Sequence, residues 1–174
     1  MKSTDVILAG IAGTTAFTIF SYMASKVLDG NKEEPELLGE MVDEAFPGMG
    51  ESESQFTGWM IHYATGIAFA AAYKGLIEST GIKPTIQNGV IAGVSSGFPA
   101  GMIWDTSLKI LPHPPVKRNA AYYTRLCLGH AIFGAASFFI LGLFSKKEEE
   151  GETLTPISVE SSQSKLSPYA TAGS

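Results

Sequence analysis

The sequence predicts an all-α fold, a bundle of four transmembrane helices with a short amphipathic surface helix after the first span. Two observations support this prediction. The 174-residue chain is only 17% charged, and its charged residues avoid four windows, at 6–25, 54–73, 84–104 and 126–145. A helix rises ~1.5 Å per residue, so each window of about 20 residues matches the ~30 Å hydrocarbon core of a bilayer.

The composition argues against several other classes of protein. The net charge is −5 and there is no basic cluster, which argues against a nucleic-acid binder. Cys127 is the single cysteine, so the chain is no disulfide scaffold. Residues 1–147 are expected to form one membrane domain, and the Ser-, Thr-, Glu- and Pro-rich residues 148–174 a disordered polar tail.

The first window could instead belong to a cleaved signal peptide, because Met23, Ala24 and Ser25 offer small side chains near a cleavage point. Asp5 lies where such a peptide is basic, however, and the apolar stretch is longer than a usual signal core. We therefore expect a retained first span.

Glycines form regular stripes in two of the windows. Gly10 and Gly13 lie in the first, and the third has glycines four residues apart, Gly89, Gly93, Gly97 and Gly101. Small residues at this spacing let two helix backbones approach closely in a membrane. The expectation is that the first and third spans pack against each other through these glycines.

The connection at 26–53 holds nine of the chain's 17 acidic residues. Within it, residues 35–46 place their apolar side chains on one helical face, and Pro35 and Pro47 suit the start and stop of a helix. The acidic opposite face disfavours adsorption to anionic lipid, so this surface helix is expected to dock on the bundle.

The second window carries the pattern G-W-x-x-H-x-x-x-G-x-x-x-A-x-x-Y, from Gly58 to Tyr73. Together with the small-residue first span and the segment 35–39, this pattern resembles families of uncharacterised small four-span bacterial membrane proteins. The resemblance covers roughly residues 5–145. It implies a four-helix membrane domain and no established activity.

Four spans put both termini on one side of the membrane and the connections 26–53 and 106–125 on the other. Counted from this second side, His62 lies ~12 Å deep and His130 ~6 Å deep, and Asp105 ends the third span there. Ionisable residues inside a membrane are costly and often functional. The candidate polar site is therefore His62, His130 and Asp105, with the paired acids Glu40 and Glu44 of the surface helix.

Each candidate also has a simpler interpretation. We expect His62 to face the bundle interior, where Thr18, Ser21 or His130 could be its partner, and such a histidine can be purely structural. Asp105 can pair with Lys109 or Arg125, and Glu40 and Glu44 can form a solvated acidic face. A haem between the two histidines and a metal site with Asp105 are chemically reasonable, but no ligand spacing supports either, so no cofactor or metal is assigned.

The sequence contains no nucleophile-elbow, Walker or zinc-protease motif, so an enzyme is not favoured. The leading hypothesis is a small membrane protein with a structural, accessory or interaction role. The alternatives are a small channel or transporter lined by His62, His130 and Asp105, and a membrane enzyme or metal or haem carrier. The expected partners are the lipid bilayer and a second copy of the chain or another membrane protein.

The expected location is a bacterial inner membrane. Lysine and arginine residues number five or six on the side of the termini and six on the other, so the positive-inside rule does not orient the chain. Cytoplasmic termini are expected only because short N-termini and even numbers of spans commonly have that orientation.

Overall fold

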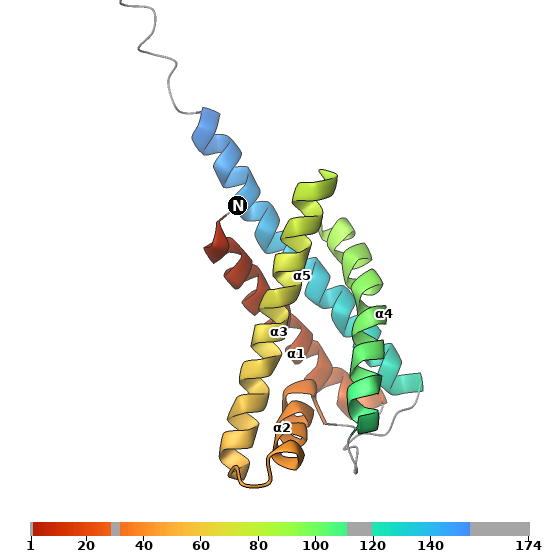
Figure 1. Cartoon of the computed structure of the whole chain (residues 1–174). Coiled ribbons are helices and arrows are strands. Elements are labelled where there is room, and N and C mark those ends of the chain that lie inside the picture. Colours follow the sequence, from red (N-terminus) through yellow and green to blue (C-terminus); the bar gives the residue numbers. More distant parts are fainter. Residues whose placement is uncertain (1, 29–31, 111–119, 154–174) are drawn as a thin grey trace, which may run out of the picture.

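The computed structural model describes residues 2–28, 32–110 and 120–153, and the all-α prediction is confirmed for this part of the chain (Figure 1). The described residues form no strand and five helices, which are α1 (Ser3–Leu28), α2 (Glu34–Ala45), α3 (Glu51–Thr80), α4 (Ile86–Ile110) and α5 (Ala120–Thr153).

The four long helices extend beyond the charge-free windows, because a helix continues into charged residues wherever these reach water. Helix α3 ends at Gly81, whose positive φ of 69° is favourable only for glycine. Helix α4 continues through Pro99 to Ile110. Helix α5 runs to Thr153, beyond the expected end of the membrane domain, and the rest of the expected tail, 154–174, lies outside the described residues.

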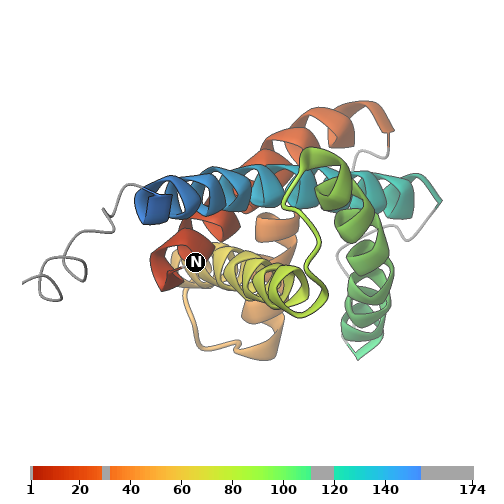
Figure 2. The ribbon, with the colours of Figure 1, turned by 90° about the horizontal axis from the view of Figure 1, so that it is seen from above.

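The helices pack in an order that differs from their order along the chain. Helix α4 packs on α5, α5 on α1, α1 on α3, and α3 on α2. Figures 1 and 2 show α1 and α5 side by side in opposite directions, with α3 and α4 at opposite edges of this array. The array is therefore curved, and its open side lies between α3 and α4.

The glycine stripe of α4 packs against α5, which corrects the expectation that it meets the first span. A side chain at Gly93 would collide with the backbone of α5 at His130, and one at Gly89 would collide with the backbone at Gly134. Farther along the stripe, Gly97 lies against the His130 side chain, whereas a Cβ on Gly101 would meet only Leu126, at 3.8 Å. The stripe correctly predicts close packing, but it does not say which helix supplies the complementary glycine.

The glycines of α1 contact two different helices. A Cβ on Gly10 would lie 2.6 Å from the Cα of Ile67 in α3, and one on Gly13 would collide with Ser137 and Phe133 of α5. Helix α1 therefore holds α3 and α5 together. This arrangement explains why α1 has small residues on more than one face.

The amphipathic helix docks on the bundle, as expected. Gly58 of α3 lies against the backbone of Gly39 in α2, so these two helices cross at two glycines. Leu37 of α2 is fully buried in a cluster with Leu108 of α4 and Tyr122 of α5. Helix α2 thus covers one end of the bundle.

Two of the helices, α1 over Ser3–Val27 and α5 over Ala120–Lys147, are long and apolar enough to cross a membrane. Within the described residues no other helix meets both criteria. The uncharged windows of α3 and α4 both contain Gly, Ser, Thr and Gln, whose small or polar side chains lower the mean hydropathy. Length and composition therefore support two spans, where the charge pattern predicted four.

Candidate functional site

A buried ionic network joins α1, α2 and α5 at the end of the bundle that α2 covers. The Arg125 side chain is fully buried; its Nη1 donates to Ser21 Oγ at 2.7 Å, and its Nη2 donates to the carbonyl of Lys32 at 3.2 Å. Ser21 donates in turn to Glu34 Oε2. The second carboxylate oxygen, Glu34 Oε1, lies 3.6 Å from Arg125 Nη2 and accepts no hydrogen bond from a described residue.

The directions of the hydrogen bonds in this network fit an ionised Glu34 carboxylate. The Ser21 hydroxyl accepts from the guanidinium, so its own hydrogen is free to go to the carboxylate. Burial raises the pKa of the Glu34 carboxyl, and the Arg125 guanidinium opposes that rise. The carboxylate is therefore costly to bury without its arginine.

Neighbouring hydrogen bonds attach α2 to the end of α1. Ser25 Oγ donates to Glu33 Oε1 at 2.9 Å, and the Tyr22 hydroxyl donates to Glu36 Oε1 at 3.2 Å. These contacts use acids of the 26–53 connection that the sequence presents only as part of a general acidic excess. They position Glu34 beside the interior of the bundle.

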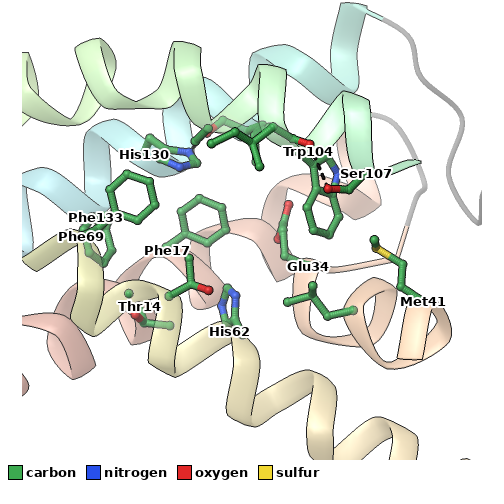
Figure 3. A pocket seen from close by; sticks show the side chains of 16 residues that line it. Thr14, Phe17, Glu34, Met41, His62, Phe69, Trp104, Ser107, His130 and Phe133 are labelled. Atoms are coloured by element: carbon green, nitrogen blue, oxygen red, sulfur yellow. Dashed lines mark hydrogen bonds between the residues drawn. The ribbon is translucent and has the colours of Figure 1, made fainter. Parts of the chain in front are cut away.

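A cavity of about 310 Å³ lies in the concave side of the helix array (Figure 3). This volume is at the lower end of the range for small-molecule sites, roughly 300–1,000 Å³. All five helices contribute to its lining, which is mostly apolar and aromatic. The lining residues are Thr14, Phe17, Glu34, Leu38, Met41, His62, Thr65, Gly66, Phe69, Ala100, Ile103, Trp104, Ser107, Leu126, His130 and Phe133.

Two of the lining residues also mark where the cavity opens. Thr65 of α3 and Ile103 of α4 are exposed on the outer surface while lining the cavity. Farther from α2, a hydrogen bond of 2.7 Å between the hydroxyls of Tyr73 and Ser96 joins α3 to α4. The cavity therefore opens sideways, between α3 and α4.

Both histidines of the predicted polar site, His62 and His130, line this cavity, and both contact the ring of Phe17. Figure 3 shows the His62 ring extending from α3 toward Phe17. His62 Nε2 lies 2.9 Å from Thr18 Oγ1, so its expected interior position and its expected partner on the first helix are confirmed. His130 Nδ1 lies 2.9 Å from the carbonyl of Leu126.

The other predicted site residues do not line the cavity. Asp105 forms an ion pair with Lys109 at 2.6 Å and accepts a hydrogen bond from Tyr123 at 2.6 Å. Glu40 pairs with Lys32, and Glu44 lies elsewhere on α2. Across 2–28, 32–110 and 120–153, no three His, Cys, Asp or Glu side chains gather in a group that could hold a metal.

The Ser21–Glu34–Arg125 network was not predicted from the sequence. Arg125 stands directly before one charge-free window, and Ser21 lies near the end of another. Both positions, at the ends of predicted spans, could have marked these residues as candidates for a polar contact. Glu34 gives no such signal, because eight other acids surround it in the same connection.

No known protein family, curated protein or solved structure matches this chain, so the resemblance noted in the sequence stays a prediction.

Proposed function

We propose that this chain is a four-span membrane protein with a non-enzymatic, accessory role, and that it binds a small apolar molecule from the bilayer in the cavity between α3 and α4. The observation that supports this proposal is the cavity itself, which is apolar, open to the side, and bears His62 and His130 on its wall. Such a site accepts a ligand that is dissolved among acyl chains.

The outer surface of the bundle supports the membrane part of the proposal. Large apolar side chains are exposed on all four long helices, and on α4 they include Ile91 at 65%, Phe98 at 71% and Ile103 at 68% exposure. Soluble monomers rarely expose apolar patches of this extent. Helix α4, with 25 residues, is ~37 Å long, which is enough to cross a bilayer.

The span assignment of α3 is tested by cysteine labelling in a Cys127→Ser background. Gly50→Cys and Ser79→Cys place one thiol at each end of α3, and both positions are exposed. If α3 spans the membrane, an impermeant maleimide labels one of the two thiols in intact cells and the other only after permeabilisation. Labelling of both from the same side would contradict the four-span proposal.

Binding is tested with Trp104, which lines the cavity. In a Trp59→Phe background, with the protein in lipid nanodiscs, ω-bromoundecanol is expected to quench the fluorescence of Trp104 in a saturable way. Thr65→Phe narrows the mouth and should abolish the saturable component. The matched control Ala64→Phe adds the same ring at an exposed neighbour outside the lining. Quenching that only rises linearly with the probe would contradict a binding site.

The transporter hypothesis makes a different demand on the same residues. A transporter that moves protons or a polar ligand needs titratable side chains along its path, and two histidines line this cavity. This observation supports the transporter hypothesis as the second candidate. Flux across proteoliposomes that depends on His62, measured with the parent and with His62→Ala, would favour transport over binding alone. Equal flux in both would leave the accessory role.

A further inference from the structure

The hydrogen-bond partners of His62 determine which of its nitrogens carries the proton. The Thr18 hydroxyl donates its single hydrogen to the carbonyl of Thr14, at 2.8 Å. With that hydrogen used, Thr18 Oγ1 accepts from His62 Nε2 at 2.9 Å. The neutral imidazole, which an apolar cavity favours, then has no hydrogen on Nδ1. That nitrogen is an acceptor with no partner among the described residues.

The same reasoning gives the opposite tautomer for His130. Its Nδ1 lies 2.9 Å from the carbonyl of Leu126 and must donate to it. In the neutral ring Nε2 is then the bare acceptor, and no described residue donates to it. Each of the two histidines thus lines the cavity with one hydrogen bond made inside the protein and one acceptor nitrogen left over.

Three other polar groups inside the cavity also present acceptors, and one, the indole N–H of Trp104, is a donor. The hydroxyls of Thr14 and Ser107 each donate to the carbonyl four residues earlier in their own helix, at 2.7 Å and 2.9 Å. Glu34 Oε1 is a further acceptor without a hydrogen bond. The indole N–H of Trp104 lies beside the Tyr122 hydroxyl. The lining therefore offers more acceptors than donors, so a ligand that supplies a donor fits it.

We infer that the ligand of this cavity is a neutral apolar molecule with a hydroxyl group, and that its hydroxyl donates to His62 or His130. This inference rests on the proposed binding function and names the ligand class. The aromatic wall of Phe17, Phe69 and Phe133 encloses the apolar body. An anion would be repelled by the Glu34 carboxylate and would find mainly acceptors, and a cation would need an unpaired carboxylate, whereas Glu34 already pairs with Arg125.

The experiment compares three probes that share one brominated undecyl chain: the alcohol, its methyl ether and the corresponding alkylammonium. Quenching of Trp104 is titrated in nanodiscs in the Trp59→Phe background. The ether lacks only the donor hydrogen, so the difference between alcohol and ether isolates the proposed hydrogen bond. One net hydrogen bond makes the alcohol bind about three- to tenfold more tightly than the ether.

The histidine variants assign that difference to particular atoms. His62→Phe and His130→Phe are each measured with all the probes, and the proposal predicts that at least one of them reduces the preference for the alcohol to less than about twofold. Binding of the ether is the internal control, because a variant that fails to fold loses both ligands. A preference that survives in both variants would overturn the inference.

The remaining outcomes separate the inference from the proposed function. Saturable binding of alcohol and ether with equal affinity would overturn the hydroxyl class and leave the binding function intact. Tightest binding of the alkylammonium would replace the hydroxyl by a cation that Glu34 recognises. If no probe quenches in a saturable way, the proposed binding function fails and the inference fails with it.

Discussion

Replacing Arg125 by methionine tests whether the buried network holds the bundle together. The arginine side chain has no exposed surface and that of Glu34 is 6% exposed, so the variant leaves a carboxylate buried with Ser21 as its remaining side-chain donor. Removing one partner of a buried ion pair costs about 3–5 kcal/mol in the free energy of unfolding. Methionine fills most of the same space, so little of this loss comes from a cavity.

The assay is reversible unfolding of the detergent-solubilised chain by sodium dodecyl sulfate, followed by circular dichroism. The matched control is Lys109→Met, which removes an exposed ion pair within one helix turn and should cost at most about 0.5 kcal/mol. Adding Glu34→Gln to Arg125→Met removes the orphaned charge and should restore about 1–3 kcal/mol. A loss below about 1 kcal/mol for Arg125→Met, or purely additive effects in the double variant, would refute the network.

The same variant should respond to pH in a defined direction. Burial raises the pKa of Glu34, and Arg125→Met removes the guanidinium that opposes the rise. A folded-state pKa above the unfolded value gives stability that is fully present below the unfolded pKa and is lost as pH rises through the folded pKa. The deficit of Arg125→Met relative to the parent should therefore shrink from about pH 7 to about pH 5. A deficit that does not change with pH would show that Glu34 takes up no proton.

Three further perturbations test the packing and the histidine contact. Gly93→Leu should lower the free energy of unfolding by at least about 1–3 kcal/mol, because it overpacks α4 against α5. Gly75→Leu, whose side chain would point into open space, should be nearly neutral in the same unfolding assay. Equal effects of the two variants would refute the close packing of α4 on α5. Gly58→Leu should release α2 and speed amide hydrogen exchange in that helix, and unchanged exchange would show that α2 does not dock there. His62→Phe and Thr18→Val should each cost about 1 kcal/mol and be non-additive together; additive losses would mean that the two side chains do not interact.

Much of the fold could be predicted because it depends on local patterns. Charge-free windows locate the long helices, and the alternation of apolar and acidic residues after Pro35 locates α2. His62 and His130, which the sequence places in the same half of the predicted membrane domain, both line one cavity. These properties follow from spacing along one helix, which the sequence states directly.

The partners of these helices could not be predicted from the same patterns. A glycine stripe is smooth toward any neighbour, so the stripe at Gly89 and Gly93 fits α5 as well as α1. Likewise, the sequence suggested that Arg125 could pair with Asp105. In the structure Arg125 pairs with Glu34, and Asp105 pairs with Lys109. Each choice depends on a contact between residues far apart in the chain.

The sequence alone therefore determined that the chain is helical, where its long apolar segments lie, and that two histidines sit within them. Tertiary structure alone decided that α3 and α4 diverge, that Glu34 is buried with its arginine, and that both histidines line one cavity. The physical reason is that helix formation follows local hydrogen bonds and hydropathy, whereas a cavity and its donors and acceptors exist only where side chains from several helices meet.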